Sequence, residues 1–233
     1  GQNFLVDEKV IEKIVNNMDE SDDVAIIEIG PGLGALTEKL LERSQKLVSI
    51  EIDQNMVEVL HDNFSDVEHF ELIHEDILKF DLDALVKQLK KDYKNVYLIA
   101  NLPYYITSDI LLNVFKLNTP IDQLMVMVQT EFGERLVSKH NTKAYRPVTV
   151  VAKTFYKCKM SFNISKNVFY PKPKITSSIV KMDVNDYYFS FEVQGRRLLS
   201  KDLISEGENR LKVELDVVYP IQTEGMKEME LLE

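Results

Sequence analysis

The chain has 233 residues, of which 45% are hydrophobic, and this is enough for one sizeable core and a small second unit. Its single cysteine excludes an internal disulfide framework and favours a reducing compartment, and its four histidines show no zinc-ligand spacing, so we expect no metal. The formal net charge of −10 argues against nucleic-acid binding, although residues 202–233, with nine acidic and three basic residues, carry much of that charge.

Targeting and membrane signals are not visible in the sequence. No uncharged apolar run is long enough to span a bilayer, and no charged-then-apolar leader begins the chain. We therefore expect a cytoplasmic protein without a membrane partner, and a monomer.

Predicted strands and helices alternate along the first 140 residues. Short apolar runs predict strands at 24–29, 46–52, 69–74, 96–100 and 123–128. Apolar residues at helical spacing predict helices at 33–41, 56–60, 82–89, 106–117 and 130–138. This alternation indicates an α/β fold in which helices cover both faces of a parallel sheet.

The later part of the chain is harder to interpret. Apolar and β-branched residues predict two late strands, at 148–156 and 175–182. We expect one domain over 1–183 and a small, mainly helical RNA-contacting appendage over 184–233. In that appendage Arg196, Arg197 and Lys201 are candidate phosphate contacts, with an ordinary solvated surface as the alternative.

A glycine-rich turn follows the first predicted strand. In Gly30-Pro31-Gly32-Leu33-Gly34 the glycines allow the backbone to approach a ligand, and the following helix offers free N–H groups. The turn lacks the third glycine of the phosphate-cradling G-x-G-x-x-G pattern, which favours a nucleoside cofactor without phosphates. The alternative is a plain strand-to-helix turn.

An acidic residue lies at the end of the second predicted strand, and another follows the third. Glu51 stands where a carboxylate can accept both ribose hydroxyls of such a cofactor, and Asp76 where one can accept from an adenine amino group. Glu51 could instead cap the next helix, although Asp53 is the better capping candidate. Asp76 could be an ordinary loop carboxylate.

The segment Asn101-Leu102-Pro103-Tyr104 directly follows the fourth predicted strand. The N6 amine of adenine is a poor nucleophile because its lone pair is delocalised into the ring. The Asn101 side-chain oxygen and the Leu102 carbonyl can accept from its two N–H groups, Pro103 stiffens the turn, and Tyr104 can stack on the base. These features indicate methylation of an adenine amine, with an Asn-capped structural turn as the alternative.

A second aromatic pair lies in the loop Phe169-Tyr170-Pro171-Lys172-Pro173. Phe169 or Tyr170 can form a second wall opposite Tyr104, with the lysines near phosphates. A proline-rich surface loop explains the same residues equally well.

In combination, these segments resemble the ribosomal RNA adenine dimethylase family, and its bacterial small-subunit branch in particular. The resemblance covers about residues 1–183 and predicts a Rossmann-like, S-adenosylmethionine-dependent methyltransferase sheet. It departs from the family near residues 195–198, where Gly-Arg-Arg-Leu only partly matches a basic helix. The matching segments are Gly1–Leu5, Glu28–Gly34, Glu51–Asp53, Glu75-Asp76, Asn101–Tyr104, Gln129–Glu131, Glu134-Arg135 and Phe169–Pro173.

The resemblance also implies a set of functional residues and a substrate. S-adenosylmethionine would be bound by Asn3, Leu5, Gly30, Glu51, Asp76 and Asn101. The catalytic residues would be Asn101, Leu102, Pro103, Tyr104 and Phe169. The implied substrate is a pair of adjacent adenines in the 3′-terminal hairpin of 16S rRNA, within an immature small subunit. The alternatives are a 23S rRNA methylase of the erythromycin-resistance type and a non-catalytic ribosome-assembly or transcription factor.

Overall fold

The computed structural model describes residues 3–139, 142–185, 190–193 and 196–199. The chain divides into two compact units, Gly1–Asp186 and Tyr187–Glu233. All of the predicted cofactor-binding and catalytic residues belong to the first unit.

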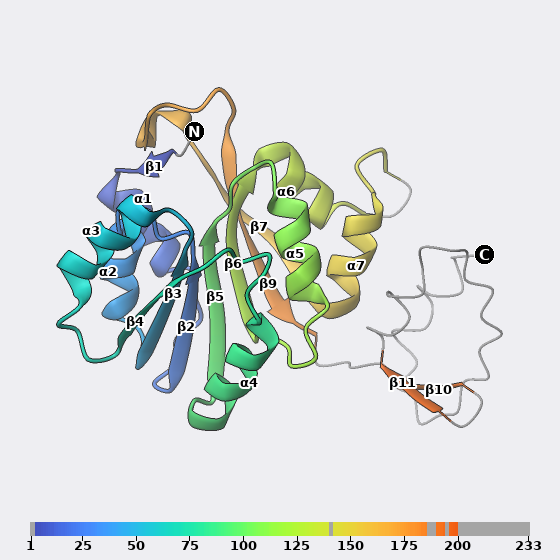
Figure 1. Cartoon of the computed structure of the whole chain (residues 1–233). Coiled ribbons are helices and arrows are strands. Elements are labelled where there is room, and N and C mark those ends of the chain that lie inside the picture. The colour runs from blue at the N-terminus through green and yellow to red at the C-terminus, as the bar shows by residue number, and fades with distance from the viewer. Residues whose placement is uncertain (1–2, 140–141, 186–189, 194–195, 200–233) are drawn as a thin grey trace. The chain divides into compact units, whose positions relative to one another are not determined.

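The first unit is built on a seven-stranded sheet in the order β4-β3-β2-β5-β6-β9-β7 (Figure 1). Five consecutive strands of this sheet are parallel, namely β2 (Val24–Ile29), β3 (Lys46–Glu51), β4 (Phe70–His74), β5 (Asn95–Asn101) and β6 (Gln123–Gln129). The prediction of a parallel sheet is wrong at its far end. There β9 (Ser177–Val184) runs antiparallel between β6 and β7 (Tyr156–Ile164). The short connection from β7 to β9 explains this, because only an antiparallel neighbour can be reached without a crossover helix.

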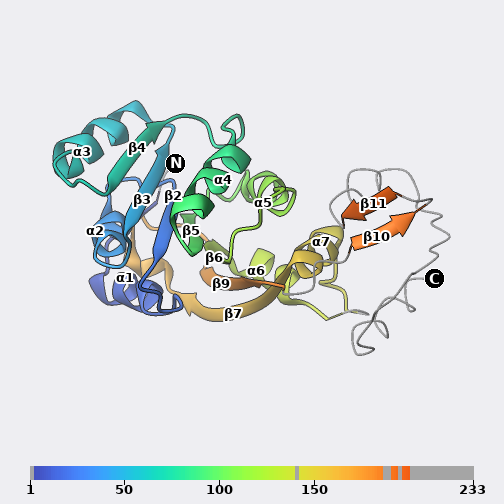
Figure 2. The same cartoon turned by 90° about the horizontal axis from the view of Figure 1, so that it is seen from below.

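Helices cover both faces of the sheet. Those described are α1 (Glu8–Val15), α2 (Ala35–Leu41), α3 (Gln54–Phe64), α4 (Leu82–Asp92), α5 (Thr107–Phe115), α6 (Thr130–Val137) and α7 (Pro147–Phe155). Figure 2 shows α1 and α2 on one side of the sheet and α4 and α5 on the other. Successive strand residues point to opposite faces, so Ile27 packs in the cluster of α4 to α7 and Ile26 in the cluster of α1 and α2. Each such fully buried side chain stabilises the fold by about 1.5–3 kcal/mol.

The prediction of a strand at 148–156 is wrong, because this segment forms helix α7. Its β-branched residues favour a strand locally, but Val148, Val151, Ala152 and Phe155 follow one another at helical spacing and pack together against the core. Pro147 occupies the first turn, where its missing N–H costs nothing. The apolar spacing and the proline therefore allow a helix here, and packing against the core selects it over the local strand preference.

Two short strands bring distant segments together. Strand β1 (Phe4–Leu5) pairs antiparallel with β8 (Phe169–Tyr170), so that Phe4 faces Tyr170 and Leu5 faces Phe169. The Val6 N–H extends this pairing by donating to the Val168 carbonyl. The N-terminal segment is thus held against the loop that carries the second predicted aromatic wall.

In the second unit, β10 (Ser190–Val193) and β11 (Arg196–Leu199) form an antiparallel pair. The part of the predicted appendage that is described is therefore strand rather than helix, and it includes the backbone of Arg196 and Arg197. Lys201 and the rest of the appendage lie outside the described residues. Within the described part of the chain, no helix is long and apolar enough to cross a membrane.

Candidate active site at the carboxyl edge of the sheet

The predicted site residues gather at one edge of the sheet. Gly30 directly follows β2, Glu51 is the last residue of β3, and Asn101 is the last residue of β5. Asp76 follows the end of β4 by two residues. The chain leaves β2 towards β3 and β4 and returns to β5 on the other side, and ligands of open α/β sheets bind at such a reversal of strand order. The predicted placement of these four residues is confirmed.

Gly30 lies between the strand ends in a backbone conformation that favours glycine. Its φ of +68° lies in the left-handed region, and its N–H donates to the Ile50 carbonyl over 3.0 Å. A Cβ at this position would be 3.7 Å from the Asn101 carbonyl oxygen. A side chain at residue 30 would therefore fill the space directly above the junction of β2 and β5.

The Glu51 carboxylate is 3% exposed and faces the glycine turn. Its Oε1 accepts from the N–H groups of Ile52 and Asp53, both over 2.9 Å, and its Oε2 accepts from the Gly32 N–H over 3.1 Å. The interpretation of Glu51 as the cap of the next helix is wrong, because the Asp53 side chain caps α3 through the Asn55 N–H. Each carboxylate oxygen has two lone pairs, so Oε2 retains capacity for a ligand hydroxyl.

Glu28, two residues before the glycine turn, is a buried acid whose role the sequence analysis missed. Its Oε2 accepts from the hydroxyls of Thr37 and Ser49, each over 2.7 Å. Among the described residues no donor reaches its Oε1. Burial outweighs these two hydrogen bonds and raises the pKa of Glu28 to about 7. An acid inside an otherwise apolar strand was the signal that could have identified it.

Asp76 shapes the loop after β4. Its Oδ1 accepts from the Leu78 N–H over 3.0 Å, and its carbonyl accepts from the Lys79 and Phe80 N–H groups over 2.9 Å. This is an Asx-type turn, so a structural role for the residue is present. In the part of the chain that the structure describes, no donor is found for Oδ2, which can accept from a ligand amine.

The turn Asn101–Tyr104 is held on several sides. Leu102 is buried, and its N–H donates to the Met127 carbonyl over 3.2 Å. The Pro103 carbonyl accepts from the Thr107 hydroxyl over 2.9 Å and from the Ile106 N–H over 3.2 Å. These contacts tie the turn to β6 and α5, which fixes the direction of its carbonyl groups.

Two hydrogen-bond acceptors of this turn remain available. The Asn101 amide NH₂ points to the Asn3 carbonyl over 3.5 Å, which leaves its Oδ1 as an acceptor. No donor among the residues described reaches this oxygen or the Leu102 carbonyl. These two oxygens are the pair of acceptors that the sequence predicts for an amine substrate, and their role in binding one stays a prediction.

The aromatic residues of the two predicted walls differ in exposure. Tyr104 is half-buried, and its hydroxyl is 2.7 Å from the Ser177 hydroxyl. Phe169 is 4% exposed and packs in the same cluster as Leu5, whereas Tyr170 is 74% exposed. On the loop before β9, Tyr170 thus offers the accessible ring, and Phe169 anchors the loop to the N-terminal segment.

An apolar rim surrounds this edge of the sheet. Seven large hydrophobic side chains stand out as exposed among the described residues, and they lie in the turns after β2 to β5, beside the β1–β8 pair or just before β9. They are Val6, Leu33, Ile52, Leu78, Tyr105, Tyr170 and Ile175. Exposed apolar groups concentrated at one end of a protein mark a binding surface.

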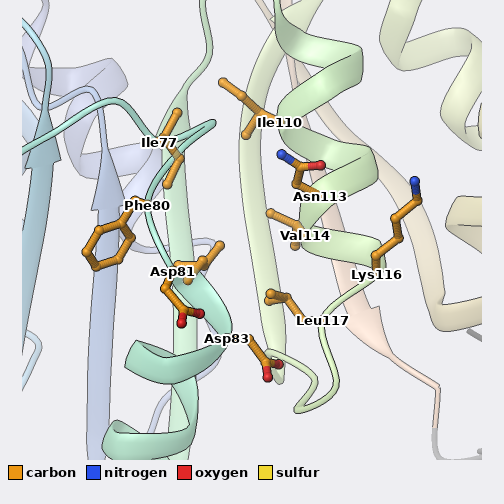
Figure 3. Close-up of a pocket in the computed structure, with 10 residues that line it drawn as sticks. Ile77, Phe80, Asp81, Asp83, Ile110, Asn113, Val114, Lys116 and Leu117 are labelled. Carbon is orange, nitrogen blue, oxygen red and sulfur yellow. The ribbon is translucent and has the colours of Figure 1, made fainter.

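A pocket of about 210 Å³ lies between the segment after Asp76 and helix α5 (Figure 3). Ile77 and Phe80 line it on one side, and Ile110, Asn113 and Leu117 on the other. None of the predicted cofactor or catalytic residues lines this pocket. It is therefore distinct from the site formed by Gly30, Glu51, Asp76 and Asn101 at the strand ends, which we call the strand-end site.

The strand-end site suits a nucleoside cofactor. It combines a backbone cradle that a Cβ would fill, a buried carboxylate at Glu51 and a further free carboxylate oxygen at Asp76. Within the described ranges, no group of three or more His, Cys, Asp or Glu residues could hold a metal ion. Burial raises the pKa of the Cys158 thiol to about 12, so it is protonated at neutral pH.

Known proteins with similar sequences share most of this unit. Residues 1–200 match the family model described as ribosomal RNA adenine dimethylase. A protein of Staphylococcus haemolyticus named ribosomal RNA small subunit methyltransferase A is 42% identical over 182 residues, which are 78% of this chain and 62% of that protein. A protein of the same name from Bacillus licheniformis is 33% identical, over 92% of this chain and 80% of its own length.

The fold agrees with this family. The crystal structure of a dimethyladenosine transferase from Plasmodium falciparum superimposes with a TM-score of 0.68 at 26% identity, covering 78% of this chain and 64% of that one. The sheet is the Rossmann-like sheet of S-adenosylmethionine-dependent methyltransferases, as predicted. The chain therefore belongs to the ribosomal RNA adenine dimethylase family.

Proposed function

We propose that this chain transfers methyl groups from S-adenosylmethionine to N6 of two adjacent adenines in the 3′-terminal hairpin of 16S rRNA. The substrate is an immature small ribosomal subunit, and the protein acts in the cytoplasm as a monomer. One observation carries the proposal. Asn101 ends β5 where the order of the strands reverses, its carbonyl oxygen would be 3.7 Å from a Cβ at Gly30, and its amide NH₂ points to the Asn3 carbonyl, which leaves Oδ1 as an acceptor.

The cofactor lies along the carboxyl edge in this proposal. Gly30 admits it close to the backbone, Glu51 accepts from its ribose hydroxyls, and Asp76 accepts from its adenine amine. The Asn3–Leu5 segment closes the site from the side, because the Asn3 carbonyl contacts Asn101 and the Phe4 ring lies over Gly32. When bound, S-adenosylmethionine supplies an electrophilic methyl carbon on its sulfonium.

The target amine lies at the Asn101–Tyr104 turn. Asn101 Oδ1 and the Leu102 carbonyl accept from its two N–H groups, which draws the nitrogen towards tetrahedral geometry and localises its lone pair. Tyr104 stacks on the flipped base, as single bases do on aromatic side chains. Phe169 supports this wall from the core, and Tyr170 is placed to contact the RNA.

Mass spectrometry of rRNA tests the proposal. The chain is incubated with isotope-labelled S-adenosylmethionine and either immature 30S particles or protein-free 23S RNA. We expect labelled N6,N6-dimethyladenosine in the 16S 3′-terminal hairpin, at two adjacent positions. Label in 23S RNA alone would indicate the resistance-type activity. Binding to 30S particles without label would indicate an assembly factor.

A further inference from the structure

We propose that Ser177 is a positioning residue that holds the Tyr104 ring in the geometry needed to stack on the target base. The inference rests on the proposed function and extends it to a residue outside the predicted site. Its starting point is the 2.7 Å contact between the Tyr104 and Ser177 hydroxyls, which joins two segments 73 residues apart.

Ser177 is suited to act as a fixed anchor. It is the first residue of β9, it is completely buried, and it faces Gln129 at the end of β6 and Ile164 at the end of β7. The residue before it is also held, because the Thr176 carbonyl accepts from the Thr130 N–H over 3.1 Å. The Ser177 hydroxyl therefore sits on a rigid point at the carboxyl edge of the sheet.

Tyr104 needs such an anchor. It belongs to a turn rather than to a helix or strand, its ring is only half-buried, and the neighbouring Tyr105 is 85% exposed. A tyrosine side chain in a turn can rotate about two bonds, and stacking on a base then costs ordering entropy. A hydrogen bond at the far end of the ring removes this freedom before the base arrives, which is preorganisation of the site.

The bond also links the two predicted aromatic walls. The Phe169–Pro173 loop precedes β9 within a few residues, so Ser177 fixes the end of the loop and the tip of Tyr104 at the same point. A displacement of the loop would therefore be transmitted to the stacking ring.

A double-mutant cycle with S177A and Y104F tests the inference. Both variants keep the Tyr104 ring and remove the hydrogen bond between the hydroxyls. We expect each to lower kcat/KM for 30S particles by about two- to tenfold, the effect of losing one neutral hydrogen bond. The double variant should lose no more than either single variant, and S-adenosylmethionine affinity measured by calorimetry should be unchanged in all three.

S178A is the matched control. Ser178 is as buried as Ser177, and its hydroxyl contacts Thr130 and Asn163 but not Tyr104. It should lose thermal stability as S177A does while retaining the wild-type kcat/KM. An S178A loss equal to that of S177A, a wild-type rate in S177A, or multiplicative losses in the double variant would overturn the positioning role. A wild-type protein that leaves 16S rRNA unmodified would instead overturn the proposed function.

Discussion

The buried carboxylate of Glu51 accepts a hydrogen bond from the backbone N–H of Gly32 over 3.1 Å, and so joins the end of β3 to the turn after β2. The same carboxylate binds the two N–H groups that follow β3. It thus orders two of the loops that form the strand-end site, and it keeps one oxygen partly free for a ligand. The same carboxylate therefore has a structural role and is the group that we propose binds the cofactor.

Glu51→Ala should weaken S-adenosylmethionine binding by roughly ten- to a hundredfold, because hydrogen bonds to a charged group contribute about 1.5–3 kcal/mol. Isothermal titration calorimetry measures the affinity directly. Asp53→Ala is the control, since it removes the α3 cap at a cost of about 1 kcal/mol in stability and should leave the affinity intact. Equal affinities in the folded Glu51→Ala variant and the wild type would remove Glu51 from the cofactor site.

Asn101→Ala should reduce methyl transfer by about 10²–10³ at saturating cofactor, because it removes an acceptor placed where charge develops on the amine. Single-turnover rates on 30S particles measure this step without product release. Asn95→Ala is the matched control, because Asn95 begins the same strand at its far end, where its side-chain oxygen accepts from the Ser21 hydroxyl over 3.0 Å. A near-normal rate in Asn101→Ala would show that the Asn101–Tyr104 turn is structural.

Glu28 should make the stability of the fold depend on pH. Its ordinary pKa of 4.5 applies in the unfolded chain, and burial raises the folded value to about 7. Below pH 4.5 the group is protonated in both states and has no effect. Between pH 4.5 and 7 only the unfolded chain releases the proton, so stability falls as pH rises, by about 3 kcal/mol in total, and then levels off.

Urea unfolding of the wild type and Glu28→Gln at several pH values between 4.5 and 8 measures how much Glu28 contributes to the pH dependence of stability. The amide keeps the shape of the side chain and does not ionise. The free energy of unfolding of the variant should therefore rise relative to that of the wild type as the pH increases to about 7. If the two stability curves ran parallel, the Glu28 carboxyl would titrate normally in the folded protein.

Gly34→Ala should destabilise the protein by roughly 2–4 kcal/mol, from left-handed strain and overpacking together. The φ of Gly34 is +86°, and a Cβ there would be 2.7 Å from the ring of Phe64. Gly133→Ala is the comparison, because Gly133 lies in helix α6, where alanine is favoured, and its Cβ would meet the flexible end of Met160 at 2.9 Å and a Val180 methyl at 3.2 Å. Urea unfolding should separate the two variants clearly. Equal stability losses would mean that backbone strain at Gly34 is unimportant.

Local patterns in the sequence determined the first half of the sheet. The apolar runs that end at Gly30, Glu51 and Asn101 are continuous, as is typical of parallel strands buried on both faces, and the structure confirms all three as strands. Because parallel strands end at one edge, the chain order alone brought these residues together. Family resemblance added Asn3 and Leu5, which no periodicity could have indicated.

Only the tertiary structure decided the rest. Segment 148–156 forms a helix because this packs Val151 and Ala152 against the core, and this packing outweighs the β-propensity of the segment. The position of β9 between β6 and β7 brought the Ser177 hydroxyl into contact with the Tyr104 hydroxyl, although the two residues are 73 positions apart. The periodicity of apolar residues indicates which face of a helix or strand is buried. Contacts such as that between Tyr104 and Ser177 depend on how whole helices and strands pack together, which no local stretch of the sequence determines.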